Sequence, residues 1–595
     1  MDTIPALFSH HAAAFAQRSL FLTKREGRVR TISWQEAGHD VDALALWLLR
    51  QHVQPGDRIL LLCENRPEWG IADLAIQSVG AWTVPVYPSL TASELSVIAS
   101  DCQPVLGIAS SLDQLEKLIA VMRQVPALRT LVLISDGVTD PKVIPWDRAL
   151  AEGREDAERL REPLSQRRRQ LRPEATCTLI YTSGTTGEPK GVMLSHRNFL
   201  SNVEACRQVI PITSSDLHLS FLPLCHVFER MAGWYLMLCL GARVAYAESM
   251  ETIPQDMLQF RPTIMLGVPR FFEKLHDRIQ EAIRSAPPQK RRLTEWALRI
   301  GRAHTRCREQ REPIPFGLQV RHVVARQLVF KTLQARLGGR LRFFVSGSAP
   351  LSKEIAQFFF SVGVTILEGY GLTETSPVIS VNRPPMPTFG SVGPAVSGVE
   401  VRIAEDGEIL TRGPHVMQGY YQKPEATREV IVDGWFHTGD IGHLDDQGRL
   451  YITDRKKDLI KTAGGKFVAP QKLEGLFVAD PLISQAFVYG DRERYCVALI
   501  VPDMEQLRRL AQQHGIGTSS PSELINHPTI HAVYWQRVQE RQQHLANFER
   551  VKQIALLDQE FSQAGGELTP TLKAKRQIIA KRHATLLQRL YESPA

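Results

Sequence analysis

The chain lacks the features that mark disulfide-rich, secreted or membrane-spanning proteins. Only eight of its 595 residues are cysteine and none forms a C-x-x-C pair, which argues against a zinc ribbon or a secreted scaffold and favours a reducing compartment. Residues 1–5 have neither the basic stretch nor the apolar core of a signal peptide. The best apolar run, 231–240, is shorter than the roughly 18 residues of a membrane-spanning helix. The sequence therefore predicts a cytoplasmic protein, with a buried helix at 231–240.

Acidic residues are fewer than basic ones, so the formal net charge is +8. Arginine gathers at 167–169, and lysine and arginine gather at 290–311. Such stretches occur on solvated helix faces, on surfaces that meet anionic lipid at the inner face of a membrane, and near sites for polyanionic small molecules. The sequence leaves these three interpretations open. The basic stretches lack interleaved aromatic residues, and no nucleic-acid-binding module is recognisable, so no nucleic-acid partner is expected.

The first third of the chain alternates capped helices with short apolar runs. Capping boxes begin at Ser33 and Thr91. Four runs predict strands: 58–63, 82–87, 105–109 and 128–135. This rhythm predicts a mostly parallel sheet with helices on its faces. Residues 140–172 are polar and predict a connecting helix and loop.

The second half of the chain changes pattern twice. Residues 284–335 predict an arginine-rich helical excursion, and 389–451 carry short alternating runs that predict a small antiparallel, barrel-like β unit. A compact α+β pattern begins at Arg455. Because 595 residues exceed what one core can organise, we predict an α/β fold of two domains. Residues 1–454 form a large domain of helix-flanked sheets and 455–595 form a small α+β domain.

A loop rich in glycine and hydroxyl groups lies between Tyr181 and Gly191, with the sequence Y-T-S-G-T-T-G-E-P-K-G. Glycine lets the backbone approach a ligand closely, and amide N–H groups, hydroxyls and a lysine suit a phosphate chain. The spacing is not that of a Walker A loop. Apolar residues on both sides predict a strand–loop–strand setting. The predicted phosphate-binding residues are Thr182, Ser183, Gly184, Thr185, Thr186, Gly187 and Lys190.

This loop resembles the phosphate-binding motif of the AMP-forming adenylating enzymes, which include acyl-CoA synthetases, firefly luciferase and peptide-synthetase adenylation domains. Three further segments match that family in the same order: G-Y-G-L-T-E-T at 369–375, G-W-F-H-T-G-D at 434–440 and D-R-K-K-D-L-I-K at 454–461. The resemblance extends from near residue 30 to the C-terminus. The passages at 222–230 and 433–470 are most similar to those of long-chain fatty acyl-CoA synthetases.

The resemblance implies an ATP-dependent ligase that activates a medium- or long-chain fatty acid in two steps. The acid first forms acyl-AMP with release of pyrophosphate, and the acyl group then passes to coenzyme A. ATP, Mg²⁺ and CoA are therefore the implied cofactor and co-substrates. Magnesium and fixed positive groups offset the charge that phosphoryl transfer develops.

The resemblance also implies roles for single residues. Glu374 is the Mg²⁺ ligand, which suits a hard cation, and Thr373 contacts the α-phosphate. Asp440 accepts the ribose hydroxyls, with Arg455 beside the ribose or phosphate. Tyr370 has a flat ring suited to stacking on adenine. The remaining predicted nucleotide contacts are Gly347, Ser348, Gly369 and Gly371.

His226 is the side chain predicted beside the fatty acid carboxylate. A histidine in apolar surroundings is more often a core residue, but the corresponding histidine of the family lines the acyl site. We do not assign it as a nucleophile, and the adjacent Cys225 shows no base pattern that would make it a catalytic thiol. Trp234 and Tyr235, which follow, line either an acyl tunnel or the plain core.

The C-terminal segment E-L-T-P-T-L-K-A-K-R at 567–576 resembles the motif that delivers the adenylation lysine of the family. Lys575 aligns best with that lysine, and Lys573 is the alternative. Lys457 falls at the family's hinge position, which implies a lid that rotates between the two half-reactions. After rotation, Lys461 and Gly464 would face the site.

Three alternative functions stay open on the sequence. The acceptor could be an acyl carrier protein, as in fatty acyl-AMP ligases; the chain could bind ATP or acyl-AMP without catalysis; or it could be a luciferase-like oxygenase. Glu374, Lys190 and Lys575 disfavour a degenerate binder, and the long-chain passages disfavour an oxygenase. The expected partners are fatty acid, ATP and CoA, whereas contacts with an acyl carrier protein, a membrane surface or a second copy in a homodimer are left open.

Overall fold

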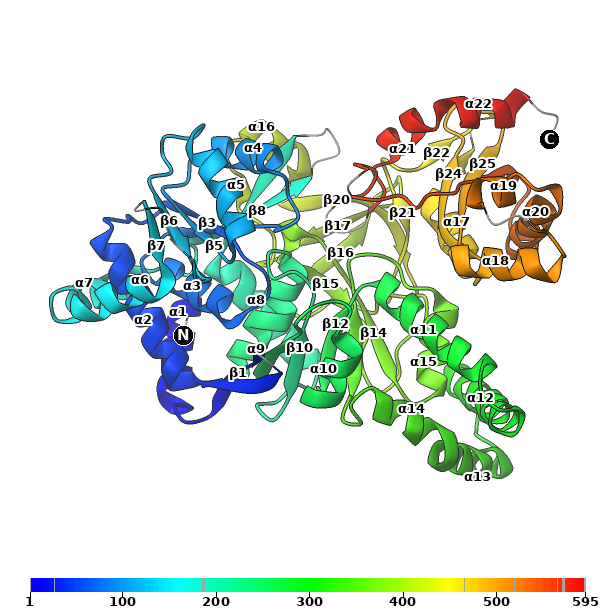
Figure 1. Ribbon diagram of the computed structural model, residues 1–595, viewed down its shortest axis with the longest axis horizontal. Helices are drawn as coiled ribbons and strands as arrows, with labels where there is room; N and C mark the ends of the chain where they lie inside the picture. Colours follow the sequence, from blue (N-terminus) through cyan, green and yellow to red (C-terminus); the bar gives the residue numbers. More distant parts are fainter. Residues whose placement is uncertain are drawn as a thin grey trace.

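The computed structural model describes residues 2–25, 27–137, 140, 142–183, 188–464, 466–517, 520–563, 565–569 and 573–592. Figure 1 shows a large body, coloured blue to green, and a smaller C-terminal part, coloured yellow to red, beside it. Two eight-stranded sheets form the framework of the body, and a five-stranded sheet lies toward the smaller part. The α/β class predicted from the sequence is confirmed.

The first eight-stranded sheet has the order β18-β9-β8-β4-β3-β5-β6-β7. The strands from β8 to β7 in this order are parallel, whereas β9 and β18 run antiparallel to their neighbours. The four predicted strands are confirmed as β3 to β6. The bounds are β3 Arg58–Leu62, β4 Trp82–Val86, β5 Leu106–Ala109, β6 Thr130–Leu133, β7 Val143–Pro145, β8 Thr176–Ser183, β9 Pro189–Ser195 and β18 Gly419–Tyr420.

Helices cover both faces of this sheet. Ile59 and Leu61 of β3 pack with α2 (Trp34–Arg50) and α3 (Pro67–Ser78), whereas Leu60 and Leu62 pack with α4 (Ala92–Cys102) and α5 (Leu112–Met122). Successive side chains of a strand point to opposite faces, so a parallel strand between two helix layers must be apolar throughout. Both predicted capping boxes are confirmed, at the N-termini of α2 and α4.

The second eight-stranded sheet has the order β15-β14-β13-β12-β10-β11-β1-β2. Its centre is parallel, and the edge strands β2 and β15 are antiparallel to their neighbours. The bounds are β1 Ser19–Arg25, β2 Arg28–Ser33, β10 Leu217–Ser220, β11 Arg243–Tyr246, β12 Ile264–Gly267, β13 Phe343–Ser346, β14 Thr365–Gly371 and β15 Val378–Val381. Helices α1 Ile4–Ala14, α8 His196–Val209, α10 Ile253–Phe260 and α15 Lys353–Ser361 complete this half of the body.

The predicted arginine-rich excursion is helical. It contains α11 Pro269–Arg284, α12 Pro288–Glu309, α13 Phe316–Ala325, a π-helix η2 at Arg326–Phe330 and α14 Lys331–Arg336. α12 packs against α15, and a Cβ on Gly301 would lie 2.4 Å from the carbonyl oxygen of Ser361. A glycine is therefore required where these two helices meet. In Figure 1, α12 and α13 project from the body at the lower right.

Residues 140–172 are more ordered than predicted. They form the edge strand β7 and two helices, α6 Trp146–Glu155 and α7 Ala157–Gln170, in place of one helix and a loop. Few residues of α6 and α7 are buried. The sequence therefore contains too few apolar residues here to show the helical repeat. The arginine cluster 167–169 binds protein groups: Arg167 donates to the carbonyl oxygens of Val53 and Val79, and Arg168 pairs with Asp42.

The predicted small β unit is antiparallel, but it is not a barrel. Its strands are β16 Glu400–Ile403, β17 Glu408–Arg412, β19 Ile431–Val432, β20 Trp435–Leu444 and β21 Leu450–Arg455, with the short helix α16 Pro424–Val430 before β19. β20 pairs with β17, β19 and β21, and among the described strands no pairing joins β16 to the opposite edge. The five strands therefore form an open sheet.

The smaller C-terminal part has its own apolar core. A three-stranded sheet of order β24-β25-β26 packs helices on both faces, and a two-stranded ribbon, β22 with β23, precedes it. The bounds are β22 Ile460–Lys461, β23 Phe467–Val468, α17 Pro470–Val478, β24 Ile483–Tyr489, β25 Cys496–Pro502, α18 Met504–Gln513, α19 Pro521–Ile525, α20 Pro528–Gln542, β26 Val551–Leu556, α21 Arg576–Arg582 and α22 Ala584–Glu592.

The apolar run at 231–240 is a buried helix, as predicted. Its first part is the π-helix η1 Glu229–Tyr235, and α9 Leu236–Cys239 continues it. π-helices are rare and often mark functional sites. None of the helices in the described part of the chain has the length and apolarity needed to cross a bilayer.

Arg230 of η1 is at the centre of a buried polar cluster and is 0% exposed. Its guanidinium donates to Asp73 Oδ1 at 2.5 Å, to Thr178 Oγ1 at 2.7 Å and to the Tyr235 hydroxyl at 3.0 Å. Asp73 also accepts a bond from the Thr83 hydroxyl at 2.8 Å. The cluster thus joins η1, α3, β4 and β8 in the interior, where an unpaired charge would be costly.

Asp73→Ala should lower the free energy of unfolding of the body by about 3–5 kcal/mol, because it leaves the Arg230 charge buried and unpaired. Urea unfolding followed by tryptophan fluorescence measures this loss, since the Trp69 ring centroid lies 5.4 Å from the guanidinium carbon. Glu162→Ala is the matched control: its ion pair with Arg169 is largely exposed and should contribute little. An unchanged unfolding midpoint in Asp73→Ala would contradict the importance of the cluster.

Candidate active site

Residues from three of the sequence motifs meet beyond the end of β14. The Tyr370 hydroxyl donates to Asp440 Oδ2 at 2.7 Å, and Arg455 Nε lies 3.3 Å from Asp440 Oδ1. Asp440 and Arg455 are opposite each other across β20 and β21. The register of the five-stranded sheet thus places this acid and this base next to the end of β14.

The electrostatics of this trio follow from burial. Burial raises the pKa of the Asp440 carboxyl, and the Arg455 guanidinium and the Tyr370 hydroxyl both oppose that rise. Burial also raises the pKa of the Tyr370 phenol well above its ordinary value, so the hydroxyl remains a donor at neutral pH. A carboxylate has about four acceptor positions, so Asp440 can hold further hydroxyl groups beside these partners.

Lys573, from the C-terminal part, enters the same space. Burial lowers the pKa of its ammonium group to about 8, and the Arg455 charge acts in the same direction, whereas Asp440 and Glu374 oppose the shift. Burial lowers the pKa of the His226 imidazole to about 4, and the Lys573 ammonium contributes to that shift. The charges of Arg455, Asp440 and Glu374 thus act on Lys573, and the Lys573 charge in turn acts on His226.

Lys575, which the sequence favoured over Lys573, has a different environment. Its backbone N–H donates to the Glu567 carbonyl oxygen at 2.8 Å, and its carbonyl oxygen accepts from Ile578 and Ile579 as α21 begins. Within the described residues its side chain forms no hydrogen bond or ion pair. In this arrangement Lys573, and not Lys575, has the electrostatic contacts expected of a residue that meets phosphates.

Glu374 lies on the single-turn 3₁₀-helix η3 (Thr373–Thr375), directly after β14. Its Oε1 accepts from the Tyr420 hydroxyl at 2.9 Å, and its carbonyl oxygen accepts from the Met417 N–H at 2.8 Å. Its second carboxylate oxygen has no hydrogen bond from any residue that the structure describes. Tyr420 was not predicted from the sequence, where nothing distinguishes it from an ordinary buried tyrosine. Thr373, beside Glu374, is half-buried.

The arms of the predicted phosphate loop are antiparallel strands, as expected, with Thr182 of β8 opposite Lys190 of β9. Lys190 Nζ lies 5.0 Å from the centroid of the Tyr420 ring, so this ring separates Lys190 from Glu374 and links the loop to the site. Ser183 is the last residue of β8. The predicted contacts Gly184, Thr185, Thr186 and Gly187 lie outside the described residues.

Two of the predicted glycines are required by close approaches. A Cβ on Gly347 would lie 3.0 Å from the ring of Phe228, two residues after His226, and a Cβ on Gly371 would lie 1.6 Å from the Pro377 carbonyl oxygen. Gly369 has only ordinary contacts at that position. Ser348 has φ +71°, which is uncommon for a residue with a side chain. The turn after β13 is thus held tightly against the His226 segment.

His226 and Cys225 lack the reactivity of a nucleophile. His226 Nδ1 accepts from the Phe228 N–H at 3.2 Å, which places the ring proton on Nε2 when the imidazole is neutral. Burial raises the pKa of the Cys225 thiol above its ordinary value, so the thiolate is disfavoured. All eight cysteines are free thiols. These findings agree with the expectation that neither side chain forms a covalent intermediate.

Lys461 and Gly464 are not part of this cluster. The Lys461 N–H donates to Asp491 Oδ1 at 3.1 Å, and its ammonium lies 5.6 Å from the Phe467 ring centroid. Both residues are exposed, and a Cβ on Gly464 would meet no atom within 4 Å. In this arrangement neither residue faces the nucleotide site.

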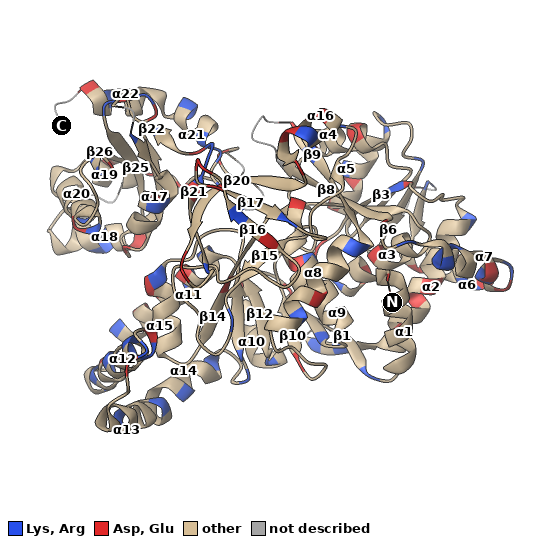
Figure 2. Cartoon of the chain, turned by 180° about the vertical axis from the view of Figure 1, so that it is seen from behind, with Lys and Arg blue, Asp and Glu red and all other residues tan. Residues whose placement is uncertain are grey.

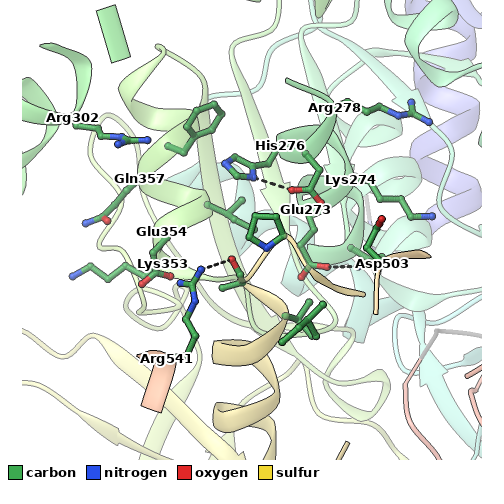
Figure 3. A pocket seen from close by; sticks show the side chains of 18 of the residues that line it. Glu273, Lys274, His276, Arg278, Arg302, Lys353, Glu354, Gln357, Asp503 and Arg541 are labelled. Carbon is green, nitrogen blue, oxygen red and sulfur yellow. Dashed lines mark hydrogen bonds and ion pairs between the residues drawn. The ribbon is translucent and has the colours of Figure 1, made fainter. Parts of the chain in front are cut away.

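A cavity of about 1000 Å³ lies elsewhere, between the body and the C-terminal part. Figure 3 shows side chains of α11, α12 and α15 on one side and Asp503 and Arg541 of the C-terminal part on the other. None of the predicted site residues that the structure describes lines it. The cavity therefore belongs to the contact between the two parts and is separate from the candidate active site.

Polar contacts tie the two parts together near this cavity. Arg270 Nη2 donates to Ser484 Oγ at 3.1 Å, and Ser484 Oγ donates to Glu560 Oε1 at 2.7 Å. Arg509 Nη1 and Glu281 Oε1 form an ion pair at 3.1 Å. These contacts could not be predicted from the sequence, because the paired residues are far apart along the chain and belong to no motif. They favour the arrangement in which Lys573 reaches the body.

Comparison with known proteins gives a consistent result. The family model of AMP-binding enzymes matches residues 8–421, and that of the AMP-binding enzyme C-terminal domain matches 457–595. The long-chain-fatty-acid–CoA ligase FadD15 of Mycobacterium bovis is 34% identical over 99% of this chain and 97% of its own. The peroxisomal long chain acyl-CoA synthetase 7 of Arabidopsis thaliana is 31% identical over 99% of this chain and 86% of its own.

Solved structures share the fold. The anthranilate CoA ligase AuaEII, in complex with anthranoyl-AMP, superposes with a TM-score of 0.75 at 19% identity, covering 99% of this chain and 98% of its own. At that identity the likeness concerns the arrangement of the elements in both the body and the C-terminal part.

The pKa of Lys573 predicts a pH-dependent stability. Its folded value, about 8, is below the ordinary 10.5, so the cost of burying the ammonium is full below pH 8 and is relieved as the pH rises from about 8 to 10.5. Lys573→Met removes this cost, so its thermal midpoint should exceed that of the wild type at pH 7, with the difference vanishing near pH 10.5. Calorimetry over this pH range measures the effect. Lys575→Met is the control, and a pH-independent difference for Lys573→Met would refute the assignment.

Proposed function

The chain belongs to the family of AMP-binding enzymes, and from this premise we propose that it is a long-chain fatty acid–CoA ligase that works through an acyl-AMP. The relatives that match it over almost their whole length are named for this activity. The observation that carries the proposal is that the charges of Lys573, Arg455, Asp440 and Glu374 act on one another beside neutral His226, because these charges suit a nucleotide whose α-phosphate is attacked by an acid.

In the first half-reaction a carboxylate oxygen of the fatty acid attacks the α-phosphorus of ATP. An O–P bond forms, and the bond to the β-phosphate oxygen breaks with release of pyrophosphate. Negative charge spreads over the phosphoryl oxygens, and fixed cations stabilise it without reorganisation. In our proposal Lys573 supplies one such charge at the α-phosphate, Thr373 donates to it, and Lys190 with the hydroxyls of the 182–186 loop holds the β- and γ-phosphates.

Glu374 suits a magnesium ion. Its Oε2 has no partner among the described residues, its other oxygen is fixed by Tyr420, and Mg²⁺ prefers one or two carboxylates together with phosphate oxygens and water. The described residues contain no cluster of three His, Cys, Asp or Glu side chains that would bind a metal alone, which fits an ion that arrives with the nucleotide. When bound, Mg²⁺ would neutralise phosphate charge.

The nucleoside and the acid have separate sets of contacts. Asp440, held by Tyr370 and Arg455, accepts the ribose hydroxyls, and the turn at Gly347 and Ser348 contacts adenine. Because Tyr370 already donates to Asp440, its ring is fixed in orientation, which suits stacking on a base. The Nε2–H of neutral His226 donates to the fatty acid carboxylate and orients it, without accepting a proton.

The second half-reaction requires the C-terminal part to move. The CoA sulfur attacks the acyl carbon, a C–S bond forms and AMP leaves. We propose that residues 455–595 rotate about Lys457 relative to 1–454, which withdraws Lys573 and presents Lys461 and Gly464. The exposure of both residues and the few polar ties near Arg270 and Arg509 support such a movement.

Other properties remain predictions. CoA is the proposed acceptor, and an acyl carrier protein is the alternative. A homodimer, a cytoplasmic location and contact with the inner face of a membrane also stay predictions from the sequence.

The function is tested by pyrophosphate release across fatty acids from C2 to C20, with ATP and Mg²⁺. We expect release with medium- and long-chain acids, and CoA should accelerate turnover while acyl-CoA accumulates. If acyl-AMP forms but CoA has no effect, the acceptor is another molecule. Absence of any adenylated product would refute the proposal.

The choice of lysine is tested by separating the half-reactions. Lys573→Ala should slow acyl-AMP formation about 100- to 1000-fold, because it removes a charge used in the transition state. It should leave thioester formation from synthetic acyl-AMP and CoA within a few fold of the wild type. Lys575→Ala is the matched control and should adenylate normally. The opposite pattern would return the role to Lys575.

A further inference from the structure

The helix α13 and the π-helix η2 that continues it carry an apolar face that no part of the described chain covers. Five large apolar side chains of this face are exposed: Phe316 84%, Val320 46%, Val323 50%, Val324 42% and Leu328 55%. Neighbouring members of this row are one, three or four residues apart, and on a helix these positions lie along one side. We call this row the α13 face.

The α13 face is not the side that fixes the helix to the protein. Ala325, Val329 and Phe330 are buried and belong to the core shared with α12 and α15. A surface helix of a globular protein normally has one apolar side toward the core and a polar side toward water. Here both sides are apolar, which indicates that the outward side meets a second apolar surface.

The charge around the α13 face has one sign. Residues 313–342 contain six arginines and lysines and no aspartate or glutamate. Arg342 pairs with Asp216, but Arg321, Arg326 and Lys331 form no ion pair with any residue that the structure describes. Figure 2 shows basic residues, coloured blue, along α12 and α13 where these helices project from the body. An apolar row beside unpaired basic side chains complements a surface that is apolar inside and anionic at its rim.

We propose that the α13 face docks on the surface of an anionic phospholipid bilayer. The apolar row would enter the boundary between headgroups and acyl chains, and the arginines would meet the phosphates, as in interfacial helices. A second copy of this chain fits less well, because a two-fold contact centred on this face brings the same surface, and therefore arginine, against arginine.

The biological meaning of this docking rests on the proposed function, since a long-chain fatty acid partitions into lipid. The docking itself does not depend on catalysis. Binding to vesicles and turnover of a water-soluble medium-chain acid can therefore fail separately, and the two results distinguish this proposal from the proposed function.

The test is co-sedimentation of the full chain with vesicles of phosphatidylcholine alone or with about one third phosphatidylglycerol. We expect binding to the anionic vesicles that weakens with salt, and little binding to the neutral ones. The triple variant Phe316→Ser, Val320→Ser, Leu328→Ser should lose most of the binding. Arg321→Glu with Arg326→Glu should weaken it by at least roughly thirtyfold, at about 1 kcal/mol for each lost basic contact.

The matched control is Val97→Ser with Leu258→Ser, which changes two side chains that are each 54% exposed on other helices. It should bind vesicles like the wild type. Unchanged thermal midpoints would show that the variants are folded. The proposal is overturned if the wild type ignores anionic vesicles, if the α13 variants bind as well as the control, or if they abolish self-association seen by light scattering while vesicle binding persists.

Discussion

One charged side chain, the ammonium of Lys573, links the two parts of the molecule. This ammonium is buried under the influence of the Glu374 and Asp440 carboxylates. Because the Arg455 guanidinium also acts on it, the carboxylates compensate the Lys573 charge only in part. A lysine in this position is costly when the site holds no anion, and the cost falls when a phosphate chain supplies the missing negative charge. The position of the C-terminal part is thereby coupled to what the site contains.

The body provides a rigid frame for that meeting. The buried cluster of Arg230 and Asp73 fixes η1 to the strand β8 that leads into the phosphate loop. η1 follows directly from the His226 segment, and Gly347 packs against the same segment. The acyl, adenine and phosphate contacts of the proposed site therefore rest on connected elements.

The two parts touch through a mixture of weak contacts. Arg270 and Ser484 line a cavity rich in charged side chains, and Arg509 pairs with Glu281 across the same two parts. Partly exposed ion pairs contribute little each, so they can select one arrangement without preventing another. α12 lines this junction, whereas none of the cavity's lining residues belongs to α13, whose outward apolar face could meet a surface without disturbing the site.

Much of the fold followed from local patterns. Capping boxes at Ser33 and Thr91, buried parallel strands and the buried helix after His226 were predicted, since cap chemistry and periodicity act over a few residues. The motifs likewise marked Tyr370, Glu374, Asp440 and Arg455. The sequence was less informative at 140–172, where few apolar residues mark the helical repeat. It also did not show whether the strands of the small β unit close into a barrel or stay an open sheet.

The sequence by itself thus determined the α/β fold class, the family that the chain resembles and the side chains available for catalysis and binding. Tertiary structure decided which groups meet. It brought Lys573 under the charges of Glu374 and Asp440, added Tyr420 to Glu374 and joined Arg270 to Ser484. It also left the apolar side of α13 outward. The physical reason is that motifs are local, whereas burial, long-range hydrogen bonding and pKa shifts arise only when distant segments exclude water from the same space.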